Sequence, residues 1–217
     1  MVTSSDPTVF VVDDDDALLD SLATMADTVG MASETFSSAR AFLDKYEVDR
    51  PGCLVLDIRM PDMNGLELQD VLKARGIDLP VVIISGHADV PLAVRALKSG
   101  AIDVLEKPFR QQVLLDCIRD AFQLDSDRRE RRERTRLYAE RFSTLTPRER
   151  EVMQLLVQGN QGKTIASALN ISYKTMEKFR AKVMKKMQAG TVVELVLMAV
   201  DLGLVDRGNT AEGSESP

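Results

Sequence analysis

The sequence has 217 residues, of which 44% are hydrophobic and 29% charged. This composition is typical of a folded globular protein, and the length allows two domains of ordinary size. No apolar run approaches the roughly 20 residues needed to cross a bilayer, and the N-terminus lacks the pattern of a secretory signal. We therefore expect a cytoplasmic protein without membrane contact. Cys53 and Cys117 lie far apart without paired spacing, which excludes a zinc cluster built on cysteines.

The net charge of −6 conceals opposite signs in the two parts of the chain. Residues 1–123 contain 11 Lys/Arg and 21 Asp/Glu, a net charge of −10, whereas residues 143–206 contain 9 Lys/Arg and 6 Asp/Glu, a net charge of +3. An acidic part suits a cation and a basic part suits a polyanion. Because +3 is a modest charge, whether this part binds a polyanion depends more on the positions of its basic residues than on their number.

The first part of the chain alternates between short apolar runs and helical patterns. The runs predict strands at Val9–Val12, Ala32–Phe36, Cys53–Leu56, Val81–Ile84 and Val104–Leu105. The helical spacing of apolar residues predicts helices at Ala17–Val29, Leu66–Ala74, Pro91–Lys98 and Gln111–Leu124. Near-continuous Val/Ile runs indicate strands buried on both faces. The order therefore predicts five βα units that form a parallel sheet with helices on both faces.

A charged stretch, Asp125–Arg136, follows the last of these helices without Gly or Pro. Its pattern predicts a solvated helix that continues from Gln111 and transmits orientation. Four helices are predicted after it: one that begins at Pro147 with Thr146 and Glu149 as a capping box, then Lys163–Leu169, a helix from Ser172 to about Met187, and Thr191–Leu202. The expected domains are residues 1–123, a linker at 124–142, residues 143–205 and a disordered polar tail at 206–217.

Polar side chains follow four of the five predicted strands. Asp13 and Asp14 follow the first strand, Asp57 the third, Ser85 the fourth and Lys107 the fifth. The carboxyl ends of parallel strands meet at one edge of a doubly wound sheet, so these side chains should converge. Neighbouring carboxylates repel one another, and Mg²⁺, which prefers oxygen ligands, removes that repulsion. A metal-bound carboxylate that faces a lysine is equipped for phosphoryl transfer, and a serine hydroxyl there can donate to a phosphoryl oxygen.

Residues 8–123 resemble the receiver domain of response regulators in three segments: VVDDDD, LVLDIRMPDMNGLEL and VVIISGHADVPLAVRALKSGAIDVLEKPF. The resemblance implies a flavodoxin-like sheet of strand order 2-1-3-4-5 and a sensor histidine kinase as phosphoryl donor. It implies these site residues: Asp57 as phosphoacceptor, Asp14, Asp57 and the Arg59 main-chain carbonyl as Mg²⁺ ligands, Asp13 through water, and Ser85 and Lys107 against the phosphoryl group.

Two further residues, His87 and Val104, lie close in the sequence to Ser85 and Lys107. Val104 stands three residues before Lys107, where receivers usually have an aromatic residue whose rotation reports phosphorylation. The signal is therefore expected to depend more on Ser85 and the helix at Pro91–Lys98. His87 is the single histidine of the chain, and we expect a loop residue rather than a phosphohistidine or a general base. The Lys107–Pro108 peptide can be cis or trans.

The predicted helix at residues 173–187 has two opposite faces. At 100° per residue, an apolar face opposes a basic face; the apolar residues are Met176, Phe179, Val183 and Met187, and the basic residues are Lys174, Lys178, Lys182 and Lys185. A lysine stripe that follows a short helix and a tight turn suits a recognition helix in the major groove of DNA. Tyr173 and Thr175 lie near its N-terminus, within reach of base edges. An ordinary solvated amphipathic helix is the alternative.

The segment LTPREREVMQLLVQGNQGKTIASALNISYKTMEKFRAKVMKKM resembles the LuxR-type helix-turn-helix, over residues 143–205. Together with the receiver it resembles the FixJ/NarL group of transcriptional regulators, closest to the FixJ side. Gly162, Met176 and Phe179 depart from the common asparagine, valine and histidine. The helix at Thr191–Leu202 pairs DNA-binding domains in the family, and it can equally serve core packing. The DNA-contacting residues implied are Lys163, Tyr173, Lys174, Thr175, Lys178, Arg180, Lys182 and Lys185.

These observations predict a transcription factor of a two-component system. Phosphorylation of Asp57 would control dimerisation and sequence-specific binding to double-stranded promoter DNA, with RNA polymerase as a further partner. The chain would catalyse only its own phosphotransfer and dephosphorylation. Two alternatives are a Mg²⁺-dependent phosphohydrolase that uses an aspartyl-phosphate and a phosphorelay adaptor without DNA binding. The first typically has its nucleophile in a D-x-D motif after strand one, whereas Asp57 follows strand three.

Overall fold

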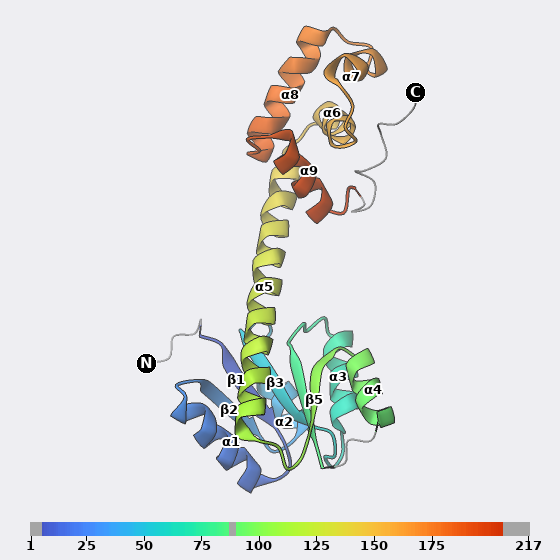
Figure 1. Cartoon of the computed structure of the whole chain (residues 1–217). Helices are drawn as coiled ribbons and strands as arrows, with labels where there is room; N and C mark the ends of the chain where they lie inside the picture. Colours follow the sequence, from blue (N-terminus) through green and yellow to red (C-terminus); the bar gives the residue numbers. More distant parts are fainter. Residues whose placement is uncertain (1–5, 87–89, 206–217) are drawn as a thin grey trace, which may run out of the picture. The chain divides into compact units, whose positions relative to one another are not determined.

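The structure is a computed structural model that describes residues 6–86 and 90–205. The chain divides into two compact units, Met1–Arg129 and Glu130–Pro217 (Figure 1). The expectations for His87 and for a disordered tail at 206–217 lie outside the described residues.

Unit 1 contains a five-stranded parallel sheet. Its strands are β1 (Thr8–Val12), β2 (Ala32–Phe36), β3 (Gly52–Asp57), β4 (Val81–Ser85) and β5 (Ala101–Glu106). They lie in the order β2-β1-β3-β4-β5, which confirms the predicted topology. Strand β5 is longer than the predicted Val104–Leu105. Several of its residues are partly or fully exposed, so the strand has no continuous apolar run and the sequence pattern revealed only part of it.

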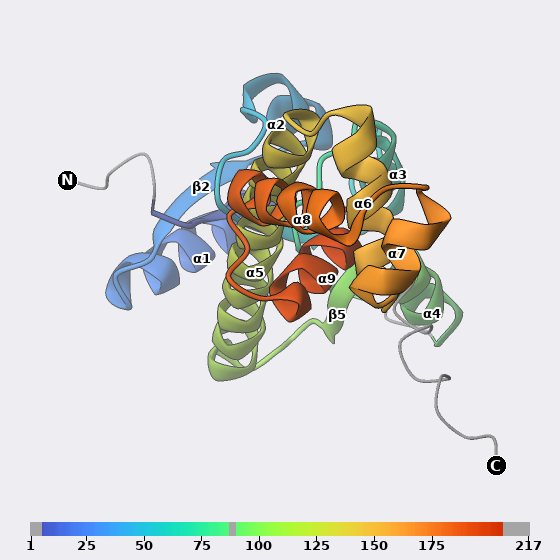
Figure 2. The same ribbon diagram turned by 90° about the horizontal axis from the view of Figure 1, so that it is seen from above.

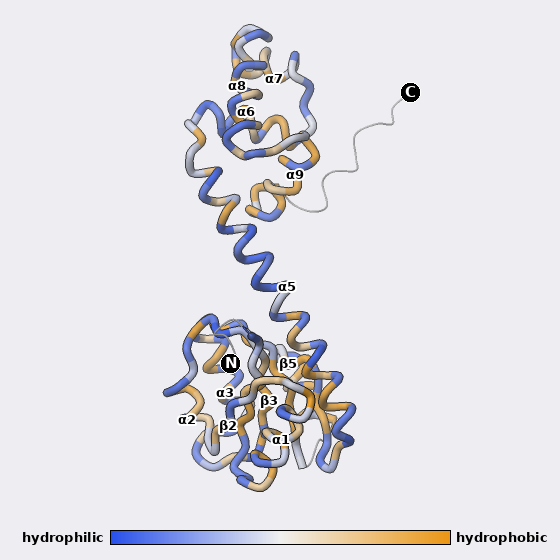
Figure 3. Tube along the Cα trace, turned by 90° about the vertical axis from the view of Figure 1, so that its left-hand side faces the viewer, coloured by the Kyte–Doolittle hydropathy of each residue, from blue (hydrophilic) through white to orange (hydrophobic). Residues whose placement is uncertain are grey.

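Five helices cover the two faces of this sheet (Figure 1). They are α1 (Asp16–Thr28), α2 (Ala39–Lys45), α3 (Gly65–Ala74), α4 (Val90–Lys98) and α5 (Gln111–Ser143). Successive strand residues point to opposite faces, so Phe10 packs with α2, α3 and α4, whereas Val9 packs with α1 and α5. Strand β3 is largely hydrophobic in Figure 3, and all six of its residues are buried. The sequence pattern did not locate α2, which spans only seven residues.

Unit 2 is helical. It contains α6 (Pro147–Val157), α7 (Gly162–Ala168), α8 (Tyr173–Met187) and α9 (Val192–Asp201), which share one core (Figure 2). The predicted capping box of Thr146 and Glu149 is confirmed. Ser172 caps α8 as predicted, since its Oγ accepts from the Thr175 N–H at 3.1 Å. Asn170, with φ of 51°, provides the left-handed residue that turns the chain between α7 and α8.

Helix α5 continues without a break from Gln111 to Ser143, as the charged pattern predicts. Its middle is strongly hydrophilic (Figure 3). One residue of that stretch contradicts the expected solvation: Asp125 is only 2% exposed. One of its partners, the Gly52 N–H, lies 73 positions away in the sequence, so the local charge pattern could not reveal its burial. In the described ranges, none of the helices combines the length and apolar character that crossing a membrane requires.

Gly52 begins β3 at a point where only glycine fits. Its φ is +151°, and a Cβ there would lie 2.0 Å from the main-chain oxygen of Thr8. We expect Gly52→Ala to reduce the free energy of unfolding by about 2–4 kcal/mol. The cost of an unfavourable φ for alanine and the cost of the clash between its Cβ and the Thr8 main chain add to each other. Gly30→Ala is the control, since Gly30 has φ of +73° but open space around its Cα, and should cost only about 1 kcal/mol. Equal losses in urea unfolding would contradict the clash.

Candidate functional site

Three charged side chains meet where β1, β3 and β5 end. Lys107 Nζ donates a hydrogen bond of 2.6 Å to Asp13 Oδ2 and one of 2.7 Å to Asp57 Oδ1. Both carboxylates are buried. Two buried carboxylates this close would repel each other, and the ammonium between them offsets that repulsion. The structure thus brings together three residues that the sequence places at three separate strand ends.

Backbone donors hold the remaining carboxylate oxygens. The Arg59 N–H donates to Asp57 Oδ2 at 2.5 Å, and the Asp15 N–H donates to Asp13 Oδ1 at 2.9 Å. Burial raises the pKa of Asp13, and the bonds from Lys107 and Asp15 oppose that rise. Burial by itself would lower the pKa of Lys107, but its two carboxylate partners raise it above its ordinary value. Lys107 is therefore a charged ammonium held at a defined place beside Asp57.

Backbone contacts between β4 and β5 aim this lysine. Ser85 is fully buried at the end of β4 and pairs in register with Glu106 of β5. The Lys107 N–H donates to the Ser85 carbonyl oxygen at 2.8 Å. The Lys107–Pro108 peptide is cis, one of the two isomers that the sequence allows. Ser85 and Lys107 are thus brought to the same edge of the sheet as Asp57.

Asp14 lies at the rim rather than in this cluster. Its side chain is exposed and lines a hollow of about 670 Å³ together with Arg59, Asn64 and Arg95. Across residues 6–86 and 90–205, no three Asp, Glu, His or Cys side chains gather closely enough to share a metal ion. Asp13, Asp14 and Asp57 nevertheless offer only oxygen donors from neighbouring strand ends, and such a donor set fits Mg²⁺.

Val104, at the usual aromatic position, is half-buried and packs against the core on the α2, α3 and α4 side of the sheet. It has no ring that could change between a buried and an exposed rotamer.

Helix α8 has the two faces that its sequence predicts. Met176, Val183 and Met187 are buried in the core of unit 2, and Phe179 is half-buried. The exposed residues of the basic face are Lys174, Lys178, Lys182 and Lys185. At its N-terminus Tyr173 is 53% exposed. Lys163 is exposed on α7, and Arg180 is half-exposed with its guanidinium 3.7 Å from Glu177 Oε1.

Two of the departures from the LuxR-type pattern compensate for each other. A Cβ on Gly162 would lie 2.4 Å from the Met176 methyl carbon and 3.1 Å from the Tyr173 ring. The larger Met176 therefore occupies space that a side chain at position 162 would need. Gly162 thereby leaves room for the end of the Met176 side chain where α7 packs on α8.

The sequence pattern missed the partner of Glu149. Glu149 is 3% exposed, and Lys186 Nζ donates to its Oε2 at 2.6 Å and to the Thr144 carbonyl oxygen at 2.9 Å. Lys186 thus differs from the lysines of the basic face, since it turns inward. The hydrogen bond from Lys186 is the largest cause of the lowered pKa of Glu149, and the Thr146 N–H adds to it.

Comparisons with known proteins agree with this division. Residues 9–119 match the response regulator receiver domain, and residues 143–199 match the luxR family of bacterial regulatory proteins. The chain belongs to the two-component response regulators with a LuxR-type DNA-binding domain. This response regulator is 44% identical to the transcriptional regulatory protein FixJ of Azorhizobium caulinodans, over 90% of this chain and 93% of FixJ. It is 39% identical to the response regulator protein TodT of Pseudomonas putida, over 87% of this chain and 83% of TodT.

Solved structures of response regulators are similar as well. The structure of StyR matches with a TM-score of 0.77 and 42% identity, over 90% of this chain and 98% of StyR. Full-length FixJ from B. japonicum matches with a TM-score of 0.55 and 40% identity, over 92% of this chain and 98% of FixJ. This response regulator is thus a transcription regulator and not a conventional enzyme, which removes the phosphohydrolase alternative. Its LuxR-type helix-turn-helix implies DNA binding, and its receiver implies a kinase partner and the Mg²⁺ that receivers generally use.

We expect Glu149→Gln to destabilise the DNA-binding domain by about 1–3 kcal/mol, because Lys186 and the α6 cap lose a charged partner. The lowered pKa of Glu149 gives stability that is complete above the ordinary glutamate pKa and is lost as pH falls through the lowered value. The difference from wild type should therefore shrink in acid. Calorimetry between about pH 3 and pH 7 measures it.

Glu151→Gln is the matched control for this prediction. Glu151 lies on the same helix and pairs with Arg148 at 2.5 Å, but its side chain is 52% exposed. An exposed pair of this kind contributes about 0–1 kcal/mol. Equal effects of the two substitutions, or a difference that does not change with pH, would contradict a stabilising buried pair at Glu149.

Proposed function

We propose that phosphorylation of Asp57 controls DNA binding through helix α8. The supporting observation is Lys107, whose ammonium holds Asp57 Oδ1 at 2.7 Å in a buried pocket. An Asp57 carboxylate oxygen attacks the phosphorus of a phosphohistidine on a sensor histidine kinase. A P–O bond forms at Asp57, the P–N bond breaks, and the kinase histidine keeps the electron pair and takes up a proton. The product is an aspartyl-phosphate.

Residues of the pocket then stabilise the transferred group. Lys107 pairs with one phosphoryl oxygen and the Ser85 hydroxyl donates to another. Asp14, Asp57 and the Arg59 main-chain carbonyl would hold Mg²⁺, with Asp13 acting through water. When bound, Mg²⁺ supplies positive charge that neutralises the carboxylates and the phosphoryl oxygens.

The basic face of α8 is proposed as the DNA-contacting surface. Exposed lysines on one helix face suit the phosphates on both sides of a major groove. Tyr173 and Thr175 lie at the N-terminal end of the helix, from which base edges are reached, and Arg180 lies in the middle of it. The residues assigned to DNA are Lys163, Tyr173, Lys174, Thr175, Lys178, Arg180, Lys182 and Lys185.

A phosphorylated homodimer would present two such helices to paired half-sites, and bivalency by itself raises apparent affinity. Helix α9 supports pairing, because Val193 is 69% and Leu197 60% exposed. Other apolar residues of α9 serve the core of unit 2, since Leu195 and Ala199 are buried. We propose a receiver at residues 1–123, a linker at 124–142 and a DNA-binding domain at 143–205, acting in the cytoplasm with RNA polymerase as a partner.

Asp57→Asn should abolish phosphorylation, because the neutral amide lacks the carboxylate oxygen that attacks phosphorus to form an acyl phosphate. Wild type incubated with acetyl phosphate and Mg²⁺ should gain one phosphoryl group by mass measurement and bind selected genomic DNA more tightly. Asp44→Asn, at an exposed position on α2, should behave as wild type. Equal labelling of Asp57→Asn would overturn the assignment of the phosphoacceptor.

Lys178→Ala should weaken binding to all DNA sequences alike and reduce the slope of log K against log salt by about 1. Fluorescence anisotropy at several salt concentrations measures both quantities. Lys98→Ala, an exposed lysine of the receiver, is the control and should leave the slope unchanged. A slope that Lys178→Ala does not alter would exclude a phosphate contact by this residue.

A further inference from the structure

A buried ionic contact attaches the linker helix to the receiver. Asp125 of α5 is 2% exposed, although it opens the charged linker stretch. Its Oδ2 accepts from the Gly52 N–H at 2.9 Å and from Arg129 Nε at 2.7 Å. The other guanidinium nitrogens of Arg129 donate to the carbonyl oxygens of Asp49 at 2.5 Å and Arg50 at 2.6 Å. Two successive turns of α5 are thereby bonded to the segment that leads into β3.

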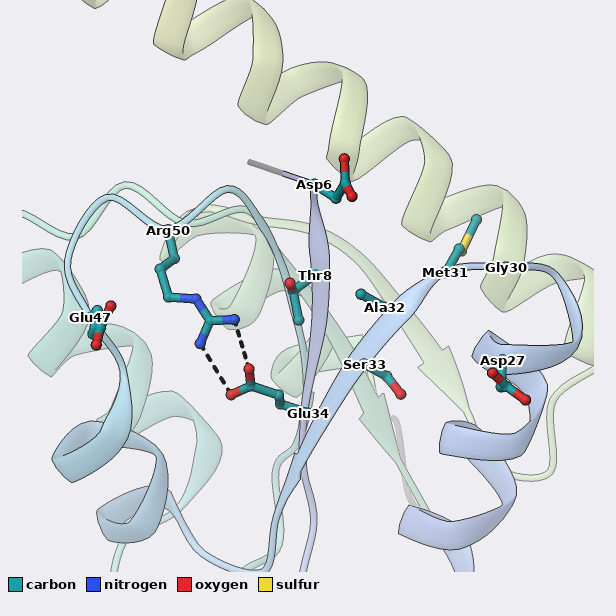
Figure 4. A pocket seen from close by; sticks show the side chains of 10 residues that line it. All are labelled: Asp6, Thr8, Asp27, Gly30, Met31, Ala32, Ser33, Glu34, Glu47 and Arg50. Atoms are coloured by element: carbon teal, nitrogen blue, oxygen red, sulfur yellow. Dashed lines mark hydrogen bonds and ion pairs between the residues drawn. The ribbon is translucent and has the colours of Figure 1, made fainter. Parts of the chain in front are cut away.

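Arg50, one of the two residues whose carbonyl oxygens accept from Arg129, has several further contacts with the sheet. The Arg50 guanidinium pairs with both carboxylate oxygens of Glu34 on β2, at 3.1 and 2.7 Å (Figure 4). It also lies over the Phe10 ring of β1, 5.0 Å from the centroid. The Tyr46 hydroxyl donates to the Arg50 carbonyl oxygen at 3.3 Å. Arg128, also on α5, donates a hydrogen bond of 2.7 Å to Asp78 Oδ1, which is a second contact between this helix and the receiver.

Stability by itself does not explain this arrangement. Burying a carboxylate costs free energy of desolvation, and apolar residues of similar size often replace a buried ion pair without loss of stability. Asp125 Oδ1 is also buried without a hydrogen-bond partner among the described residues. Two apolar surfaces can shift along each other. The hydrogen bonds of Asp125 and Arg129 to the Gly52 N–H and to the carbonyl oxygens of Asp49 and Arg50 fix one position of α5 along the sheet. The contact therefore specifies where α5 is held.

The contact also lies on the strand that ends at the phosphoacceptor. Gly52 is the first and Asp57 the last residue of β3, and all six residues of this strand are buried. β3 is paired in register with β1 on one side and with β4 on the other. Asp125 is thus bonded to one end of a rigid strand whose other end bears Asp57.

Unit 2 has contacts of its own with the following turns of α5. Arg134 Nε donates to Asp201 Oδ2 of α9 at 3.0 Å, and Tyr138 and Phe142 pack against the core of unit 2. Residues 130–133 are the short helical stretch between these contacts and Arg129. A continuous helix is a semi-rigid spacer, so this stretch can pass on orientation only if α5 is fixed at both ends.

We propose that Asp125 and Arg129 are positioning residues that fix α5 to β3, and that the gain in DNA binding on phosphorylation depends on this attachment. The proposal rests on the function proposed above, since it presumes phosphorylation of Asp57. It supplies the connection that Val104, without an aromatic ring, does not provide. Neither residue touches the phosphoryl pocket or the basic face of α8.

The first test compares Asp125→Asn and Arg129→Gln with Arg136→Gln in the full chain. Arg136 lies on the same helix and pairs with Glu133 at 2.7 Å, but both side chains are more than half exposed. Labelling of Asp57 by acetyl phosphate and DNA affinity without phosphate should match wild type in all three. The gain in affinity on phosphorylation should fall by about tenfold in the first two variants only, within the usual range of allosteric coupling.

An unchanged gain in Asp125→Asn and Arg129→Gln would overturn the proposal. Absence of labelling or of any gain in wild type would instead overturn the proposed function, so the two failures are distinguishable. Calorimetry shows whether either substitution unfolds the receiver.

A second test leaves the contact intact and changes the helix after it. Insertion of two helix-forming residues between Arg132 and Glu133 rotates the following turns by about 200°, whereas four residues rotate them by about 40° beyond a full turn. The two-residue insertion should remove the gain on phosphorylation, and the four-residue insertion should retain most of it. Equal gains in both variants would show that α5 does not pass on orientation and would overturn the proposal, even if the point variants proved unstable.

Discussion

The ammonium of Lys107 between Asp13 and Asp57 is the interaction on which the rest of the receiver depends. Parallel strands bring their carboxyl ends to one edge, so the fold gathers the carboxylates, and burial makes their repulsion costly. Lys107 offsets that repulsion from β5, which requires β5 to lie beside β4 and β4 beside β3. The strand order is therefore what gives Asp57 a cation at bonding distance.

The same physical solution recurs at two other places. Asp125 is buried against Arg129, and Glu149 is buried against Lys186. In each case a carboxylate out of contact with water is bonded to one cation and to a backbone N–H, that of Gly52 or of Thr146. These pairs define positions, because hydrogen bonds have direction and apolar packing does not. One pair lies where phosphate is expected, one holds the linker helix, and one caps the first helix of the DNA-binding domain.

Charge is used differently on the two units. The receiver buries its functional charges at strand ends, whereas α8 exposes a lysine face above a core of Met176, Val183 and Met187. A small phosphoryl group needs a few fixed charges in a pocket, and a long polyanion needs a row of charges spaced along a surface. Lys186 is the exception on α8, since its ammonium pairs with the buried Glu149 and does not join the exposed lysine face.

The sequence by itself determined the βα order, the polar residues at the strand ends and the two faces of α8, because these features depend on short-range periodicity and on the rule that parallel strands end together. The strand order came from the resemblance to receiver domains. Only the tertiary structure decided that Lys107 lies between Asp13 and Asp57 while Asp14 stays at the rim, that Gly162 makes room for Met176, and that Asp125 is buried. The Asp125 contact joins residues 73 positions apart, and in the sequence Asp125 cannot be distinguished from its solvated neighbours. Pairings over such distances follow from how helices pack on the sheet, and no local pattern encodes them.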